Sequence, residues 1–184
     1  MLLQMAGRPG TGKTTLSRAI ADALGLAVLD LDVVKTALLD AGIGWADAGR
    51  TAYEVLFALA EDNLRAGQRV VIDSPSRYPV IPERGQRIAA AHGVRYAFIE
   101  CRCPDRAEIE RRMTGRTPMR GQMRGLTPTA AEAPPEYTDD DTAHRALSRI
   151  CGPADGWLRL DTLTRRPETC LAQALAYLGV QGAV

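Results

Sequence analysis

The sequence GRPGTGKT at residues 7–14 decides how this chain folds, because every fixed position of the pattern G-x-x-x-x-G-K-[ST] is present. The apolar run LLQMA precedes it, and the helical pattern KTTLSRAIADAL overlaps its end. Glycine lets the backbone curl so that successive N–H groups point inward, and the N-terminus of the following helix adds partial positive charge. The motif therefore predicts a loop between a buried strand and a helix that binds the phosphates of a nucleotide.

Two side chains at the end of this loop carry the expected chemistry. Lys13 would reach the β- and γ-phosphates, and the Thr14 hydroxyl would bind Mg²⁺. A chance glycine-rich turn is the alternative, and the strand, the spacing and the helix together argue against it. The predicted nucleotide contacts from this stretch are Gly7, Arg8, Pro9, Gly10, Thr11, Gly12, Lys13, Thr14 and Thr15.

Apolar runs and helical patterns alternate along the rest of the chain. The runs are short and mostly continuous, as in strands of a parallel sheet that is buried on both faces. We therefore predict a three-layer α/β fold with helices on both faces of a five-stranded parallel sheet, in a single domain over residues 1–184. The expected strands are residues 2–6, 26–30, 69–73, 95–100 and 157–161. The expected helices are residues 13–24, 33–40, 50–65, 80–92, 104–114 and 167–178.

The composition narrows the class of protein. The chain has 184 residues, 46% of them apolar and 24% charged, and its net charge is +1. This balance is typical of a soluble globular protein, and it offers no strong overall field for nucleic acid or membrane. No apolar run is long enough to span a bilayer, and we interpret the opening run as a buried strand. The four cysteines form no C-x-x-C pair, so reduced thiols in a cytoplasmic protein are expected.

Acidic residues follow two of the predicted strands. Asp73 ends RVVID and could hold Mg²⁺, although an Asp at that point could also be a turn or cap residue. Asp30 and Asp32 end the second strand, where ligands of an open parallel sheet bind. We predict that Asp32 accepts the proton of an attacking hydroxyl and that Asp30 contributes to metal or acceptor binding. The alternative for both is a helix N-cap.

The ordered segments GRPGTGKTT, LDLDVVKTAL, VVIDSP, FIECRCPDRAEIERRMTGR and LRLDT together resemble the P-loop small-molecule kinases over nearly the whole chain. The nearest resemblance is to bacterial "AAA-family ATPase" kinases, which are similar to chloramphenicol phosphotransferase, zeta toxins, shikimate and gluconate kinases, and the kinase half of polynucleotide kinase. The resemblance implies ATP and Mg²⁺ as cofactors and the strand order 2-3-1-4-5. It also implies that Asp32 is the catalytic base or orients the acceptor, and that Asp73 is the strand-three acid. SPSR after strand three, in place of a G-G-G turn, argues against shikimate.

The basic run RRMTGRTPMRGQMRG, from residue 111 on, interrupts the alternation of strands and helices. A solvated surface loop is one interpretation. The resemblance gives another, in which residues 111–141 form a lid whose arginines Arg111, Arg112 and Arg116 close over the phosphates. We assign Arg112 and Arg116 to catalysis and nucleotide binding. Thr138 and Asp141 predict a capping box that opens a short helix ending near residue 150.

The acceptor pocket should lie on the Asp32 side of the cleft. We expect its walls to come from the loop at residues 42–47, from the helix after it and from the loop at 74–78. Tyr53 and Phe57 could instead be ordinary helix core. The predicted acceptor contacts are Asp30, Asp32, Lys35, Trp45, Tyr53 and Arg77.

Together these features predict an ATP- and Mg²⁺-dependent phosphotransferase that acts on a hydroxyl of a small molecule. An antibiotic, another secondary metabolite or a nucleoside-like compound would be the acceptor, and the enzyme would be a monomer or homodimer. Two alternatives stay open, a nucleotide-binding regulatory ATPase and a 5′-hydroxyl nucleic-acid kinase. A chain with no added domain leaves little room for the first, and a net charge of +1 disfavours the second.

Overall fold

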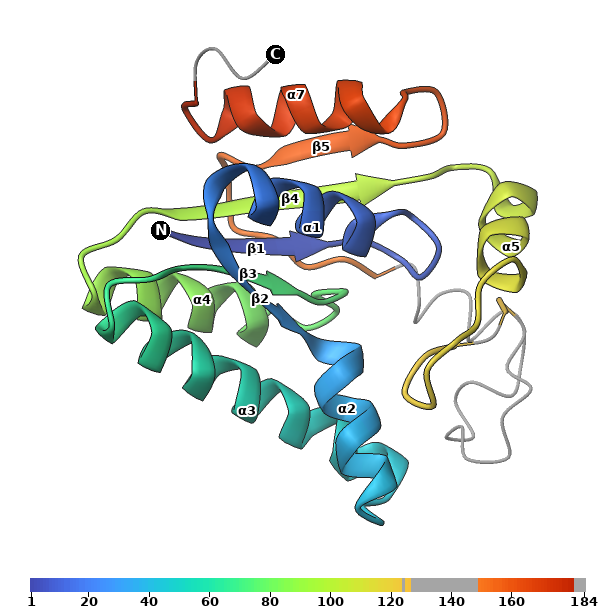
Figure 1. The fold of residues 1–184 in the computed structure, drawn as a ribbon, viewed down its shortest axis with the longest axis horizontal. Helices are drawn as coiled ribbons and strands as arrows, with labels where there is room; N and C mark the ends of the chain where they lie inside the picture. Colours follow the sequence, from blue (N-terminus) through green and yellow to red (C-terminus); the bar gives the residue numbers. More distant parts are fainter. Residues whose placement is uncertain (124, 127–148, 181–184) are drawn as a thin grey trace.

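The computed structural model describes residues 1–123, 125–126 and 149–180, which form one five-stranded sheet with flanking helices (Figure 1). The strand order is β2-β3-β1-β4-β5 and every pairing is parallel, so the predicted α/β class and strand order are confirmed. The strands are β1 (Leu2–Ala6), β2 (Leu26–Asp30), β3 (Arg69–Asp73), β4 (Tyr96–Arg102) and β5 (Leu158–Asp161).

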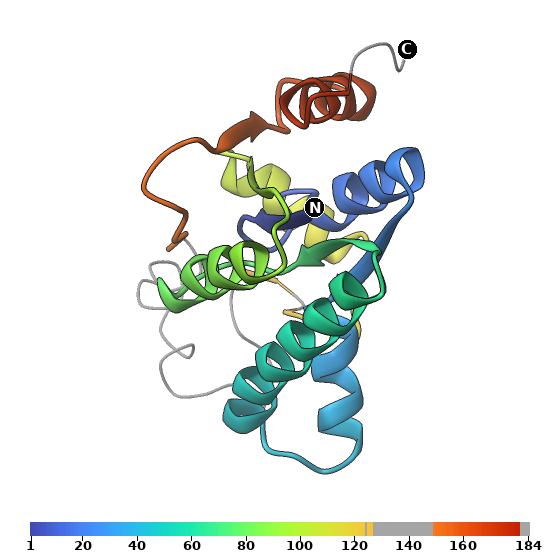
Figure 2. The same ribbon diagram turned by 90° about the vertical axis from the view of Figure 1, so that its left-hand side faces the viewer.

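Helices cover both faces of the sheet (Figure 2). α1 and α7 pack on one face through one apolar cluster, and α3 and α4 pack on the other through a second cluster. The helices are α1 (Lys13–Leu24), α2 (Leu31–Asp40), α3 (Trp45–Arg65), α4 (Val80–Ala91), α5 (Arg106–Thr114) and α7 (Pro167–Tyr177). Among the described residues, no helix combines the length and apolar character needed to cross a membrane.

The central strand β1 explains why the apolar runs are continuous. Leu3 and Met5 face the α1 side and Leu2 faces the α3 side, and all three side chains are fully buried. Full burial of a side chain of this size contributes about 1.5–3 kcal/mol. The first apolar run is therefore the centre of the core, as the sequence predicts.

Three helices begin at different residues from those predicted. α2 begins at Leu31 rather than residue 33, because the Asp30 side chain accepts a hydrogen bond from the Asp32 N–H and caps the helix there. α3 begins at Trp45, five residues earlier than predicted, with Gly44 as its N-cap. Trp45 is therefore the first residue of a helix, and its prediction as a loop residue was wrong.

The start of α5 was also predicted wrongly. The sequence places Pro104 in the first turn, but the helix begins at Arg106. The Asp105 carboxylate accepts hydrogen bonds from the N–H groups of Ala107 and Glu108, and this cap fixes the start of the helix two residues later. The predicted capping box, the predicted helix up to residue 148 and most of the predicted lid lie outside the described residues, and residues 149–150, where that helix was predicted to end, are not helical.

Candidate active site

The loop of residues 7–14 connects β1 to α1, and its glycines have conformations that other residues would strain. Gly7 has φ +139°, and a Cβ there would lie 2.4 Å from the carbonyl oxygen of Cys101. Gly10 has φ +78°, and its Cβ would lie 3.0–3.1 Å from Ile109 and Met113 of α5. The loop is therefore held close to both β4 and α5, which only glycine permits.

Hydrogen bonds within the loop maintain its curl. The Thr11 hydroxyl donates to the carbonyl oxygen of Arg8 at 2.8 Å, and the Lys13 ammonium donates to the same oxygen at 3.2 Å. Lys13 thus spans the loop from its last turn. Its side chain lines the adjacent cleft, where a triphosphate chain would pass.

Asp73 lies beside this loop and is almost fully buried. The Ser17 hydroxyl donates to its Oδ2 atom at 3.4 Å, while Oδ1 has no hydrogen-bond partner among the described residues. Burial raises the pKa of Asp73, and the nearby Lys13 charge and a hydrogen bond from Thr14 oppose that shift. An unpartnered carboxylate oxygen next to a threonine hydroxyl fits Mg²⁺, which takes one or two protein oxygens together with substrate phosphates. Asp73 and Thr14 would hold the ion.

Asp30 lies next to Asp73, because the two residues pair across β2 and β3. Its Oδ1 atom caps α2, and its Oδ2 atom lies 3.6 Å from the Arg18 guanidinium without a hydrogen bond. Burial raises the pKa of Asp30, and the negative charges of Asp73 and Asp32 raise it further. The cap interpretation is therefore correct for Asp30, although its carboxylate also lines the cleft. Its assignment as a metal or acceptor ligand stays a prediction.

Asp32 lies in the first turn of α2 and faces the cleft. Its Oδ2 atom accepts a hydrogen bond of 2.9 Å from the side-chain amide of Gln122. The Gln122 amide oxygen in turn accepts from the Met119 N–H at 3.2 Å, so the amide is held from both ends. No motif marks a lone Gln in a basic run, and the sequence interpretation missed this residue.

The segment around Gln122 lies along α2. The Gly121 N–H donates to the Thr36 hydroxyl at 3.0 Å, and Arg120 donates to the Leu39 carbonyl oxygen at 2.9 Å and forms an ion pair with Asp40. A Cβ at Gly121 would lie 2.9 Å from the Thr36 hydroxyl oxygen, so this approach requires glycine. Residues 119–122 therefore cover the Asp32 side of the cleft, and their opening and closing as a lid stays a prediction.

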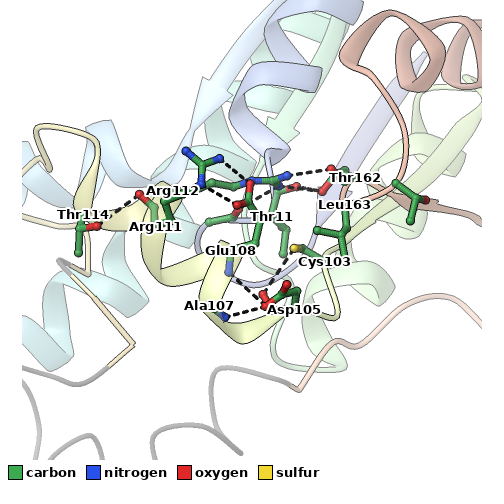
Figure 3. Close-up of polar contacts among 12 residues, drawn as sticks. Thr11, Cys103, Asp105, Ala107, Glu108, Arg111, Arg112, Thr114, Thr162 and Leu163 are labelled. Atoms are coloured by element: carbon green, nitrogen blue, oxygen red, sulfur yellow. Dashed lines mark hydrogen bonds and ion pairs between the residues drawn. The ribbon is translucent and has the colours of Figure 1, made fainter.

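Arg112 of α5 connects three parts of the nucleotide site (Figure 3). Its Nε donates to Glu108 at 2.6 Å, and its two Nη atoms donate to the hydroxyl and carbonyl oxygens of Thr162 at 3.1 and 2.9 Å. The Thr162 hydroxyl also donates to the carbonyl oxygen of Thr11 at 3.0 Å. Hydrogen bonds from Arg111 and Arg112 lower the pKa of Glu108 to about 2. Arg112 is thus fixed by α5 and the loop after β5, and it lines the cleft.

The other basic residues differ in their position. Arg116 lines the cleft and donates to the Met123 carbonyl oxygen at 3.1 Å. The Arg111 side chain is 73% exposed, binds Glu108 and does not line the cleft, so its contact with the phosphates stays a prediction.

A cleft of about 760 Å³ joins most of the predicted site residues. Gly7, Arg8 and Thr11 do not line it; Arg8 and Thr11 border a separate hollow of about 400 Å³ beside Glu100 and Asp161. The predicted residues that line the main cleft are Pro9, Gly10, Gly12, Lys13, Thr14, Thr15, Asp30, Asp32, Lys35, Trp45, Tyr53, Asp73, Arg77, Arg112 and Arg116.

Aromatic and basic side chains form the end of the cleft beyond Asp32. The Lys35 ammonium lies 3.4 Å from the centroid of the Trp45 ring. Tyr53 lines the cleft and stacks on Phe57 at 6.3 Å, and burial raises the pKa of its hydroxyl to about 12. Phe57 itself is 1% exposed and belongs to the core, so only Tyr53 of this pair is a pocket wall.

Comparison with known proteins identifies the family to which the chain belongs. The loop, the parallel sheet and its strand order define a P-loop nucleotide-binding protein, and the model of the family described as "AAA domain" matches residues 2–133. The chain belongs to that family. It is 29% identical over 158 residues to the uncharacterized protein Rv2004c of Mycobacterium tuberculosis, an alignment that covers 78% of this chain and 31% of that protein. The chain therefore spans about a third of the length of the curated relatives that it matches.

Solved structures of kinases share the fold over almost the whole chain. A candidate kinase from Chloroflexus aurantiacus has a TM-score of 0.70 and 24% identity, with coverage of 96% of this chain and 97% of that one. The Mycobacterium tuberculosis APS kinase CysC, in complex with AMPPNP and APS, has a TM-score of 0.68 and 20% identity, covering 97% and 96%. A sugar kinase from Janibacter has a TM-score of 0.67 and 20% identity, covering 98% and 95%. At these identities the likeness establishes the fold, which is that of P-loop kinases.

Proposed function

We propose that this protein is a Mg²⁺-dependent phosphotransferase that moves the γ-phosphate of ATP to a hydroxyl of a small molecule. The observation that carries the proposal is the continuity of one cleft, which runs from Lys13 and Thr14 past Asp32 to Trp45 and Tyr53. Its volume of about 760 Å³ lies within the range of small-molecule sites. The cleft extends beyond the phosphate-binding loop, so a second substrate has its own walls.

The residues divide the chemistry between them. Asp32 accepts the proton of the acceptor hydroxyl while that oxygen forms a bond to the γ-phosphorus, and the bond from phosphorus to the β–γ bridging oxygen breaks to release ADP. Lys13 neutralises charge on the β- and γ-phosphates. A bound Mg²⁺ neutralises further phosphate charge, and Asp73 and Thr14 would hold it. Arg112 and Arg116 contribute positive charge from the side of α5.

Similarity to kinases of known structure supports the choice of ATP and of a small-molecule acceptor. APS kinase, a structural neighbour, is in complex with AMPPNP, an analogue of ATP, and other neighbours are a sugar kinase and a gluconokinase. An antibiotic, another secondary metabolite or a nucleoside-like compound is the acceptor class that we propose. A regulatory ATPase would need no walls such as Trp45 and Tyr53, and a nucleic-acid kinase would need a more basic surface than a net charge of +1 provides.

The test is an acceptor screen with product identification. ADP formation is measured with Mg²⁺ and ATP alone and with antibiotics, nucleosides, sugars, hydroxy acids or a 5′-hydroxyl oligonucleotide, and products are examined by mass spectrometry. We expect one class of small molecule to raise the rate and to gain one phosphoryl group. Fast hydrolysis without any acceptor would favour the regulatory ATPase, and labelling of the oligonucleotide alone would favour the nucleic-acid kinase.

A further inference from the structure

Lys35 is a half-buried cation in the cleft wall, and no described residue is its anionic partner. Its ammonium lies over the Trp45 ring, 3.4 Å from the centroid. Among residues 1–123, 125–126 and 149–180 no hydrogen bond or ion pair satisfies this ammonium. A cation–π contact offsets part of the cost of removing a charge from water, but it leaves the three N–H donors unused. Lys35 can therefore bind an acceptor group in the cleft.

The acidic side chains at this end of the cleft are already engaged. Asp32 accepts a hydrogen bond from Gln122 on one oxygen, and Glu54 forms an ion pair with Arg84 at 2.6 Å. Burial lowers the pKa of Lys35 to about 8, and the negative charge of Asp32 opposes this shift. The two side chains do not form an ion pair in the described structure. The acids therefore do not neutralise the ammonium directly.

A second cation lies near Lys35. Arg77, from the loop between β3 and α4, lines the same cleft, and its charge contributes to the lowered pKa of Lys35. A charge in a partly buried position, such as that of Lys35, interacts with a negative group much more strongly than it would in water. The acceptor end of the cleft is thus complementary to an anion, while Asp32 stands between it and the phosphate-binding loop.

We propose that the acceptor is an acidic hydroxy compound whose carboxylate or phosphate group binds Lys35 while its hydroxyl faces Asp32. This inference rests on the proposed function and names the class of its second substrate. The Trp45 ring would pack against the carbon skeleton between the two groups. A neutral polyol can also accept a hydrogen bond from Lys35, but a charge-assisted bond is roughly twice as strong, so the acidic compound is preferred.

The test uses acceptors in matched pairs. Each pair differs only in charge: sugar acids with the corresponding alditols, hydroxy acids with their primary amides, and nucleoside monophosphates with nucleosides. ADP formation and phosphorylated product are measured for every compound with Mg²⁺ and ATP. We expect the acidic member of the active pair to have at least about tenfold higher kcat/KM, which corresponds to about 1.4 kcal/mol. The carboxylate and phosphate pairs distinguish the two sources of negative charge.

Variants at Lys35 test the assignment of the residue. In Lys35→Met the preference for the acidic member should disappear through a higher acceptor KM, with the affinity for ATP unchanged, and Lys35→Arg should retain the preference. Arg159→Met is the matched control, because Arg159 also lies over a tryptophan ring, at 3.8 Å from Trp157, but does not line the cleft. It should leave acceptor kinetics unaltered.

The outcomes separate this inference from the proposed function. Stimulation by the neutral members alone, by no member at all, or an acidic preference that survives in Lys35→Met would overturn the inference. Rapid ATP hydrolysis that no acceptor alters would instead overturn the proposed function.

Discussion

The two halves of the cleft are built in different ways. The phosphate half comes largely from one continuous stretch, in which Thr11 and Lys13 hydrogen bond to the Arg8 carbonyl oxygen and fix the loop before any nucleotide binds. The acceptor half is assembled from α2, α3, the loop after β3 and residues 119–122, and there Lys35 lies against Trp45 without an anionic partner among the described residues. The first half is preorganised by its own backbone, whereas in our proposal an acidic group of the acceptor completes the second half.

The largest effect should come from the phosphate half. Lys13→Ala removes the charge at the β- and γ-phosphates, and we expect at least about 10³-fold loss of phosphate transfer. Within the described part of the chain, the variant loses one hydrogen bond, to the Arg8 carbonyl oxygen at 3.2 Å, so the thermal unfolding midpoint should stay close to that of the unmodified protein. A variant that folds and retains its transfer rate would refute the assignment of the loop.

Asp32 lies where the two halves meet. Asp32→Asn keeps the shape but cannot accept a proton, and loss of a general base costs about 10²–10⁴-fold in rate. Nucleotide affinity, measured by calorimetry with a non-hydrolysable ATP analogue, should change little. If Asp32→Asn is fully active and Asp30→Asn is not, the two roles are reversed.

Gln122 connects residues 119–122, which cover one side of the cleft, to the proposed base Asp32. In Gln122→Glu a carboxylate replaces the amide that donates to Asp32 at 2.9 Å, so this hydrogen bond is lost and two like charges face each other. We expect the acidic limb of the kcat/KM profile to move to higher pH and kcat to fall about tenfold at neutral pH. Gln122→Met, similar in length but uncharged, should lower kcat without that displacement. Identical profiles in all three proteins would show that the contact has no catalytic role.

The acceptor half should respond through KM. Trp45→Ala removes the ring under Lys35, and we expect about a tenfold increase in the acceptor KM, with ATP affinity unchanged. Steady-state kinetics with each substrate varied in turn distinguishes the two. An equal change in both KM values would mean that Trp45 supports the whole cleft rather than one end.

The smallest effect should be a pH dependence of acceptor binding. Burial lowers the pKa of Lys35 to about 8, Asp32 opposes this shift and Arg77 adds to it, so the ammonium loses its charge as pH rises through that value. The KM of an acidic acceptor should therefore increase above about pH 8. Lys35→Arg should abolish the increase, because a guanidinium stays protonated in this range. A constant KM from pH 7 to 9 in the unmodified protein would contradict the interpretation.

Features of the fold that depend on local sequence signals were predicted well. The bounds of β1, β2, β3 and α1 were predicted correctly. Continuous apolar runs and a glycine directly after a helix are local signals that the sequence shows without the tertiary structure. The starts of α5 and α3 were predicted wrongly. Both Pro104 and Asp105 are signals for a helix start, and α5 follows the Asp105 cap. Gly44, the N-cap of α3, is a weak signal in the sequence.

Long-range contacts escaped prediction for a different reason. Gln122 meets Asp32 across 90 residues of sequence, and Arg112 meets Thr162 across 50, so the tertiary path of the chain decides both contacts. The acidic residues at the strand ends were found because parallel strands bring their carboxyl ends to one edge of the sheet. Lys35 and Trp45 were placed correctly in the cleft, although Trp45 belongs to a helix.

The fate of the γ-phosphate distinguishes transfer to an acceptor from hydrolysis. The reaction is run in oxygen-18-labelled water with Mg²⁺, ATP and the acceptor that the screen identifies, and the phosphorus products are resolved by NMR. Transfer to a hydroxyl puts the phosphate on the acceptor as an ester without the heavy isotope, and we expect this ester to be the main product. Inorganic phosphate carrying oxygen-18 as the main product would show that water is the acceptor, and it would contradict the assignment of the protein as a small-molecule kinase.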